Sequence, residues 1–270
     1  MSPFRTALDA GVPQFGLCVM YPAAGAVERI GADWDWIWLD GQHGEIGPGD
    51  MLALVRACDL VGRPAFVRVP GHEAGPVGLA LDMGASAVIV PCVDTPEQAR
   101  AVVAAAKFPP LGNRSYGGRR PIDRHGRGYA ATANAETLLV VQIESPLAIE
   151  NADHIAAVPG VDALFLGPDD IMLRRGFTMD TPRSEATLGA DMRAVVAACT
   201  RHGKRAVTVG IGAEMLSLCL RTGFHLIVGG SDVAFLAQSS RQAAADARSG
   251  AAAGEATLPI ANRQAASGPY

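Results

Sequence analysis

Eight short apolar runs recur along this chain, and they restrict its fold more than any other feature. Their nearly continuous hydrophobicity is typical of parallel strands that are covered on both faces. Most segments between them carry helical patterns, for example Pro96–Lys107, with proline in the first turn and lysine in the last. Eight strands alternating with helices predict a closed (β/α)8 barrel, a TIM barrel. The runs are Phe15–Met20, Trp36–Asp40, Ala65–Val69, Ala87–Pro91, Leu138–Glu144, Ala163–Gly167, Arg205–Val209 and His225–Gly229.

A doubly wound open sheet is the alternative arrangement of the same α/β elements. Dinucleotide-binding sheets of that kind carry the glycine pattern G-x-G-x-x-G after the first strand. The segment Cys18–Gly25, which follows the first run, lacks that spacing. Its absence favours the barrel, in which the active site lies at the carboxyl ends of the strands.

The composition fits one large core. The chain has 270 residues, 49% of them hydrophobic, and we expect a single barrel domain over residues 1–248 and a disordered tail over 249–270. No apolar run approaches the ~20 residues that span a bilayer, and the first residues do not resemble a secretory signal, so we expect a cytoplasmic protein without a membrane partner. A net charge of −4 argues against nucleic-acid binding. The five scattered cysteines predict reduced, buried thiols.

Polar side chains stand where several predicted strands end. Because the carboxyl ends of all barrel strands meet at one rim, we expect these side chains to lie close together. The set contains one histidine, one arginine, two amides and several acids. Its members are Asp40, Gln42, His43, Arg68, Gln142, Glu144, Asp169 and Asp170.

Glu144 and Asp170 form a pair of carboxylates at the ends of consecutive strands. Two carboxylates with open positions for water and a substrate oxygen are a ligand set that Mg²⁺ or Mn²⁺ prefers. Such a cation would polarise a substrate carbonyl and stabilise an enolate, and Arg68 would add a second positive charge there. Histidine is the usual residue type for proton transfer at neutral pH, so His43 is the candidate for that role. Asp40, three residues earlier, is the local candidate for the acid that orients His43.

Each of these residues also has an ordinary structural explanation. An aspartate after a strand often caps the next helix, which applies to Asp40 and Asp169. A lone histidine is more often a hydrogen-bonded structural residue than a catalyst. Arg68 is harder to explain, because a cation inside a barrel strand is costly to bury unless an anion accompanies it. The combination, rather than any single residue, predicts a site.

Six segments of the sequence carry a family resemblance. They are Trp34–His43, Phe66–Pro70, Leu81–Ala85 with Ile89–Pro91, Phe108–Arg114, Val141–Glu144 and Gly160–Asp170. In this order they resemble the signature segments of the HpcH/HpaI aldolase family, and the resemblance spans roughly Gly16 to Leu236. It implies a barrel of the phosphoenolpyruvate/pyruvate-binding type.

The resemblance implies an enzyme, a class II pyruvate aldolase. Such a carbon–carbon lyase reversibly cleaves a 4-hydroxy-2-oxo acid to pyruvate and an aldehyde by way of a metal-bound pyruvate enolate. The implied cofactor is a divalent cation, Mg²⁺ or Mn²⁺ or else Co²⁺, with no organic cofactor. The implied partners are the small keto acid and aldehyde and further copies of the chain. In the implied homohexamer, a C-terminal helix containing Asp232–Ala237 would pack on a neighbouring subunit.

Metal and substrate contacts follow from the resemblance by position. Glu144 and Asp170 match the metal ligands. Gln142 matches a residue near the bound pyruvate, and Arg68 matches the arginine that holds the keto-acid oxygen and the enolate. Asp169 stands where the family more often has a small residue whose backbone N–H helps to bind the substrate carboxylate. Either its side chain turns away and leaves that N–H available, or the substrate preference differs.

For proton transfer, the resemblance and the spacing favour different acids. His43 matches the catalytic histidine of the family. Asp82 matches its acidic partner, which in the family reaches across from a neighbouring subunit. Spacing alone favours Asp40 in that role, whereas the family pattern makes Asp40 a further acid close to the site.

The segment Lys107–Glu136 is a long predicted loop that contains five arginines. Loops of this length are usually functional or disordered. Two interpretations stay open, a solvated surface excursion and a loop that recognises an anionic substrate. Within it, Arg114–Pro121 looks like the branch of the family that acts on heptanedioate-type hydroxy keto acids, the 4-hydroxy-2-oxoheptanedioate aldolases.

Two other functions are alternatives to the aldolase. A lyase of the citrate-lyase-β or malyl-coenzyme-A type resembles the same superfamily, but it would need a place for a coenzyme A tail, which no sequence feature requires. A catalytically silent barrel kept for ligand binding would not need His43, Arg68, Glu144 and Asp170 together, so the intact set argues against it.

Overall fold

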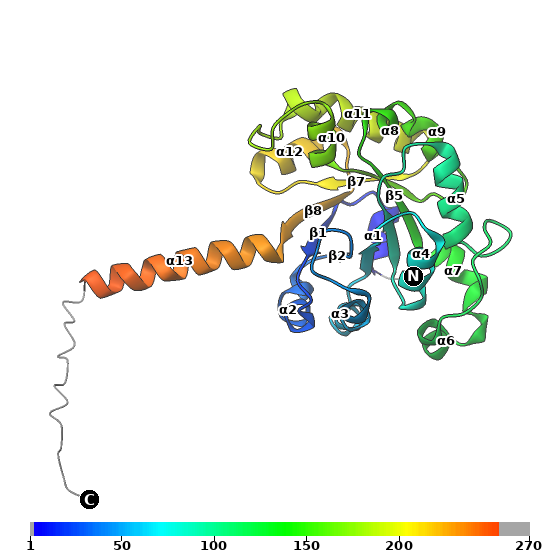
Figure 1. The fold of residues 1–270 in the computed structure, drawn as a ribbon, viewed down its shortest axis with the longest axis horizontal. Coiled ribbons are helices and arrows are strands. Elements are labelled where there is room, and N and C mark those ends of the chain that lie inside the picture. Colours follow the sequence, from blue (N-terminus) through cyan, green and yellow to red (C-terminus); the bar gives the residue numbers. More distant parts are fainter. Residues whose placement is uncertain (1–2, 254–270) are drawn as a thin grey trace, which may run out of the picture. The chain divides into compact units, whose positions relative to one another are not determined.

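The computed structural model describes residues 3–253, and the chain divides into two compact units, Met1–Val233 and Ala234–Tyr270. The first unit holds eight parallel strands that pair in sequence order and close on themselves (Figure 1). This confirms the predicted TIM barrel and excludes the open sheet. The strands are β1 (Gln14–Val19), β2 (Trp36–Asp40), β3 (Ala65–Arg68), β4 (Ala87–Val90), β5 (Leu138–Ile143), β6 (Ala163–Leu166), β7 (Arg205–Val209) and β8 (Leu226–Ser231).

Within the first unit, helices connect the strands and surround the barrel (Figure 1). The predicted helix over Pro96–Lys107 is present as α5, where the Thr95 hydroxyl accepts the N–H of Gln98 as an N-cap. The α-helices are α1 (Pro3–Asp9), α2 (Ala24–Ile30), α3 (Pro48–Leu60), α4 (Ala74–Asp82), α5 (Pro96–Ala106), α6 (Arg119–His125), α7 (Ala130–Glu136), α8 (Pro146–Glu150), α9 (Ala152–Ala156), α10 (Pro168–Arg174), α11 (Glu185–Arg201), α12 (Ala213–Thr222) and α13 (Asp232–Ala253), with the 3-10 helices η1 (Gly31–Asp33) and η2 (Arg127–Tyr129).

Aromatic side chains fill the inside of the barrel. The rings of Trp36 and Phe66 lie 4.7 Å apart, and Phe4 of α1 packs edge-on against Phe66 at 5.8 Å. A Cβ at Gly16 would lie 2.4 Å from the Trp36 ring, so glycine is needed there. Because α1 precedes β1, this packing closes the amino end of the barrel and leaves the carboxyl end for a site.

The segment Lys107–Glu136 is not the long loop that the sequence predicts. It contains α6, η2 and α7, which are held by a small core of Phe108, Tyr129 and Ala133. A local core of this kind requires contacts between residues about 25 apart, which a glycine- and arginine-rich pattern does not reveal.

Four of the five arginines of this segment pair with acids of the same chain. Arg120 and Arg124 both pair with Asp59, near the end of α3, while Arg119 pairs with Asp123. Since α3 ends where the chain turns back toward the start of β3, these pairs lie toward the amino end of the barrel. Their location favours the surface excursion over a role in recognising a substrate of the same subunit.

Three further expectations can be compared with the described residues. All five cysteines are free, and all but Cys92 are buried, as predicted. No helix within residues 3–253 combines the length and apolarity that crossing a bilayer requires. Of the expected tail, residues 254–270 lie outside the described residues, whereas α13 extends to Ala253.

Candidate active site

A buried ion pair joins the ends of β2 and β3. Asp40 and Arg68 are directly paired in the strand register, so both side chains point to the same side of the sheet. Arg68 donates from Nε to Oδ1 at 2.9 Å and from Nη2 to Oδ2 at 2.6 Å. Asp40 is only 1% exposed and Arg68 6%. The forked geometry holds the guanidinium in one orientation, above the Trp38 ring at 4.6 Å.

The ion pair with Arg68 offsets the rise in the pKa of Asp40 that burial causes. Burial by itself raises the pKa of the Asp40 carboxyl. The hydrogen bond and charge of Arg68, together with the N–H groups of His43 and Gln42, lower that pKa by more, and it lies below its ordinary value. Asp40 is therefore ionised at neutral pH and paired with Arg68.

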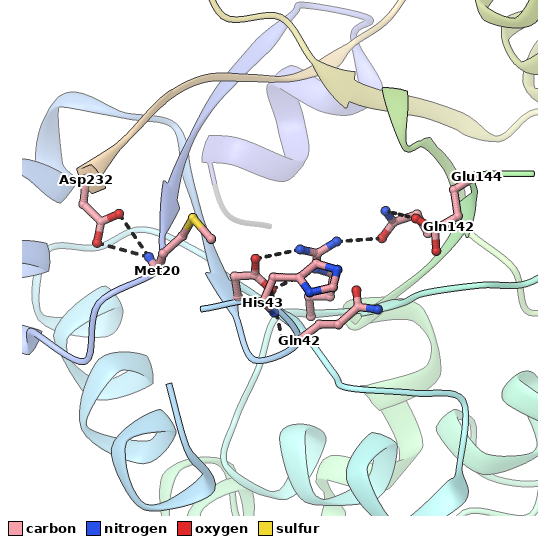
Figure 2. Close-up of polar contacts among 8 residues, drawn as sticks. Met20, Gln42, His43, Gln142, Glu144 and Asp232 are labelled. Carbon is pink, nitrogen blue, oxygen red and sulfur yellow. Dashed lines mark hydrogen bonds and ion pairs between the residues drawn. The ribbon is translucent and has the colours of Figure 1, made fainter. Parts of the chain in front are cut away.

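A chain of hydrogen bonds continues from this pair to Glu144 (Figure 2). Arg68 Nη1 donates to Gln142 Oε1 at 3.4 Å, and Gln142 Nε2 donates to Glu144 Oε2 at 2.5 Å. Gln142 and Glu144 come from the end of β5, which lies two strands beyond β3. The structure thus brings together four of the residues that the sequence placed at the rim.

The backbone around Cys92 fixes the second oxygen of Glu144. Cys92 has φ 56°, the left-handed conformation that non-glycine residues rarely adopt, and its N–H donates to Glu144 Oε1 at 2.6 Å. Burial raises the pKa of Glu144. Hydrogen bonds from Cys92 and the charge of Arg68 oppose this rise, the charge of Asp170 adds to it, and the pKa lies above its ordinary value.

Asp170 lies in the first turn of α10, directly after β6, and is half-buried. Its carboxylate has no hydrogen-bond or ion-pair partner among residues 3–253. Its charge raises the pKa of Glu144, so the two carboxylates repel each other across the site. A divalent cation bound between them would offset this repulsion.

The donor set fits a hard cation with few protein ligands. Within residues 3–253, no group of three or more histidines, cysteines, aspartates or glutamates lies close enough to hold a metal. Glu144 and Asp170 would thus supply two ligands, and the other positions would be left for water and substrate oxygens, which is how proteins commonly bind Mg²⁺.

Gly167 makes room for this arrangement. A Cβ at Gly167 would lie 2.8 Å from Gln142 Nε2 and 2.9 Å from Glu144 Oε2. We expect Gly167→Ala to displace the Glu144 carboxylate and to weaken metal binding about 10- to 100-fold, the usual effect of disturbing the surroundings of a ligand. Titration with Mn²⁺ by calorimetry measures the change.

Gly25→Ala is the matched control, because no atom lies within 4 Å of the Cβ position at Gly25. It is expected to bind Mn²⁺ like the unchanged protein. Equal affinity of both alanine variants would show that Glu144 is not constrained by the end of β6.

The side chain of Asp169 is turned toward a cation outside the hydrogen-bonded chain. Arg183 donates from Nε to Oδ1 at 2.8 Å and from Nη2 to Oδ2 at 2.6 Å, and the Asp169 side chain is exposed. This geometry favours the first of the two alternatives for Asp169, in which the carboxylate turns away and leaves the backbone N–H available.

His43 is held by its backbone rather than by its ring. The N–H groups of Gln42 and His43 donate to Asp40 Oδ1 at 3.0 and 3.2 Å. The His43 side chain is exposed, and its imidazole has no hydrogen-bond partner among residues 3–253. The spacing suggested that Asp40 orients the imidazole of His43. The structure shows that it does not, because both carboxylate oxygens of Asp40 are bonded to Arg68.

Asp82 makes no hydrogen bond or ion pair with His43 of the same subunit among residues 3–253. It is the last residue of α4, whose nine residues lead away from the carboxyl end of β3 for about 13 Å. There Arg114 Nη2 donates to Asp82 Oδ1 at 2.7 Å. A single chain thus brings His43, Arg68 and Glu144 to one end of the barrel and leaves Asp82 toward the other.

The site and the barrel agree with a known family. The sequence model described as HpcH/HpaI aldolase/citrate lyase matches residues 23–239, which cover every strand from β2 to β8 and all the site residues. The chain belongs to this family. The resemblance of the six signature segments is thereby confirmed.

Individual known proteins are similar to most of the chain. A 4-hydroxy-2-oxovalerate aldolase of Novosphingobium aromaticivorans is 39% identical over 65% of this chain and 68% of its own length. A hydroxypyruvate/pyruvate aldolase of Rhizorhabdus wittichii is 32% identical over 92% and 99%. A crystal structure of an HpcH/HpaI aldolase/citrate lyase family protein from Burkholderia cenocepacia has a TM-score of 0.83 at 31% identity, covering 92% of this chain and all of that one.

These relationships make this HpcH/HpaI protein an aldolase, a carbon–carbon lyase. The family consists of class II pyruvate aldolases, which cleave keto acids to pyruvate and generally depend on a metal.

Proposed function

We propose that this aldolase cleaves a 4-hydroxy-2-oxo acid reversibly to pyruvate and an aldehyde, with Mg²⁺ or Mn²⁺ bound by Glu144 and Asp170. The observation that carries the proposal is the hydrogen-bonded chain from Asp40 through Arg68 and Gln142 to Glu144. Through Gln142 it links the guanidinium to Glu144, and no cationic side chain within residues 3–253 bonds to the carboxylate of Glu144 or Asp170. When bound, the cation would supply Lewis-acid polarisation of the keto group.

Arg68 stabilises the charge that develops on the keto oxygen. Its Nε and Nη2 are engaged by Asp40, while Nη1 makes only a long bond of 3.4 Å to Gln142. Nη1 is therefore the donor that is available to the substrate oxygen. Its hydrogen bond would strengthen as that oxygen becomes the enolate oxygen of pyruvate. Because Asp40 holds the guanidinium beforehand, little reorganisation is needed during the reaction.

His43 accepts the proton of the C4 hydroxyl, directly or through a water molecule, as the bond between C3 and C4 breaks. The electrons of that bond pass into the enolate, and the hydroxyl carbon becomes the aldehyde. His43 then returns the proton, directly or through water, to C3 of the enolate, which becomes pyruvate. The exposed imidazole is free of other hydrogen bonds in the described chain, so it can approach the substrate.

Asp82 assists the His43 of a neighbouring subunit in a homo-oligomer, which we propose to be the hexamer implied by the sequence resemblance. The lack of a hydrogen bond or ion pair with His43 of the same barrel, among residues 3–253, supports a role in another copy. A groove of about 690 Å³ beside α4, lined by Gly75, Gly78, Leu79 and Asp82, would accommodate an element of that copy. Leu79 is 46% exposed, which a subunit contact would cover.

Metal removal tests the proposal. The protein is incubated with 4-hydroxy-2-oxoheptanedioate and shorter analogues, and pyruvate is measured. We expect pyruvate release with added Mn²⁺ or Mg²⁺, loss of release in EDTA, and recovery when the cation is returned in excess. A malyl-coenzyme-A arm tests the alternative lyase. Release that is unaffected by EDTA, or absent with the whole panel, would contradict the proposal.

A further inference from the structure

Asp232 is a buried carboxylate that the proposed reaction does not use. It follows β8 as the first residue of α13 and is 3% exposed. Met20 N–H donates to both of its oxygens at 3.1 Å, Tyr21 N–H donates to Oδ2 at 3.0 Å, and Val233 N–H donates to Oδ1 at 2.8 Å. No cationic side chain pairs with it among residues 3–253. Backbone N–H groups alone thus compensate its buried charge.

These bonds fix the chain just after β1, beyond the strand pairing. The ladder between β1 and β8 reaches Cys18, which is paired with Ser231. Met20 and Tyr21 lie past the end of that ladder, and the Asp232 carboxylate bonds both of them to the residue that follows β8. Loss of the carboxylate is therefore expected to loosen this loop and to leave the barrel closed.

Met20 in turn supports the segment that carries His43. The Met20 carbonyl accepts the N–H of Glu45 at 2.8 Å. A Cβ at Gly44 would lie 2.8 Å from the same carbonyl oxygen and 2.4 Å from the carbonyl oxygen of Asp40. The backbone after His43 is thus packed between Met20 and Asp40, and only glycine fits there.

We infer that Asp232 is a positioning residue for His43, acting through Met20 and the backbone at residues 44–45 (Figure 2). The imidazole makes no hydrogen bond within residues 3–253, so its place depends on the backbone that carries it. Asp40 secures that backbone on one side, and Met20, which Asp232 holds, secures it on the other. As a statement about catalysis, the inference rests on the proposed function.

Asp232→Asn tests the inference with little change of shape. One oxygen becomes an NH₂ group that would face the N–H of Met20 and the N–H of either Tyr21 or Val233, donor against donor. We expect kcat for pyruvate release to fall up to about 100-fold, as expected when a reacting group is misplaced by about 1 Å. The KM for the keto acid and the affinity for Mn²⁺ should stay the same, because Arg68, Gln142 and Glu144 are not moved.

A double-mutant cycle of Asp232→Asn with His43→Ala separates the positioning of His43 from a general disturbance of the fold. If Asp232 acts through His43, adding Asp232→Asn to His43→Ala causes no further loss of kcat. Asp35→Asn is the matched control, since Asp35 accepts the N–H of Phe15 at 2.8 Å near the start of the same strand. It should leave kcat unchanged. An equal loss from Asp232→Asn in both backgrounds would overturn the inference.

Hydrogen exchange tests the same contact without turnover. In Asp232→Asn, peptides covering residues 20–22 and 43–45 should exchange faster, while residues 138–144 stay protected. Unchanged exchange at residues 43–45 would overturn the inference, even for a protein that releases pyruvate. Conversely, the unchanged protein could release no pyruvate while Asp232→Asn exchanges faster at residues 43–45. That result would refute the proposed function but support the structural link from Asp232 to the backbone after His43. Should Asp232→Asn not fold, Asp232→Ser, which can still accept one N–H, replaces it in both tests.

Discussion

Glu144→Gln and Asp170→Asn are each expected to weaken Mn²⁺ binding by more than about 100-fold and to abolish metal-dependent pyruvate release. Loss of a ligand should exceed the 10- to 100-fold effect of disturbing its surroundings. Glu144→Gln has a second consequence, because its amide would have to accept from both Cys92 N–H and Gln142 Nε2, and only one of its terminal atoms can accept. Calorimetric Mn²⁺ titration and a pyruvate assay measure both effects.

Asp169→Asn is the matched control for these variants. Asp169 adjoins Asp170 in sequence, but its carboxylate is exposed and bound by Arg183. Its replacement removes the same charge from the same helix turn and should leave Mn²⁺ affinity close to that of the unchanged protein. Retained metal binding in both ligand variants, or an equal loss in Asp169→Asn, would contradict the assignment.

The pH dependence of Mn²⁺ binding should also identify Glu144 and Asp170 as the ligands. Burial and the charge of Asp170 raise the pKa of Glu144, and a protonated carboxyl is a poor ligand. As the pH falls, Mn²⁺ affinity should begin to decrease at a higher pH than an ordinary glutamate would give. In Asp170→Asn the repelling charge is absent, so the remaining weak binding should persist to lower pH.

Arg68→Met is expected to impair both stability and catalysis. It leaves the Asp40 carboxylate buried without a counter-charge, which typically costs about 3–5 kcal/mol of unfolding free energy. It also removes the donor to the developing oxyanion, an effect of about 100- to 1000-fold in kcat. Chemical denaturation and pyruvate release measure the two losses separately.

Replacing Asp40 as well separates the contribution of Arg68 to stability from its contribution to catalysis. In Arg68→Met with Asp40→Asn no uncompensated charge remains, so much of the stability should return while kcat stays low. The stability loss of Arg68→Met should be constant across neutral pH. The lowered pKa of Asp40 means that the contribution of the ion pair is present above the ordinary carboxyl pKa and lost only as the pH falls through the lower one. Recovery of kcat in the double variant would refute the role of Arg68 at the oxyanion.

The barrel could be predicted because its signal is local. Apolar runs mark the strands, and β2 and β7 have the predicted bounds, while the others differ only at their ends. The rim followed from the same runs, since Asp40 and Arg68 both end strands that are neighbours in the barrel. Their pairing across 28 positions was not predicted, because the spacing assigned Asp40 to His43.

Other contacts have no signal in residue type or spacing. Asp40 and His43 are close in sequence, yet the carboxylate turns to Arg68, because a buried guanidinium requires an anion more than an exposed imidazole does. Cys92 holds Glu144 through a main-chain N–H, a group that every residue type except proline carries. Gly167 did carry a weak signal, since glycine at a strand end often marks a close approach of other atoms.

Gln142 gives the site a fixed polarity. Its single amide presents oxygen to the guanidinium of Arg68 and N–H to the carboxylate of Glu144, so it joins the part of the site that attracts anions to the part that attracts cations. A ligand that draws Arg68 away from Gln142 changes the hydrogen bond that Glu144 receives. Keto-acid and cation affinities are then thermodynamically linked, and each must alter the other by the same factor.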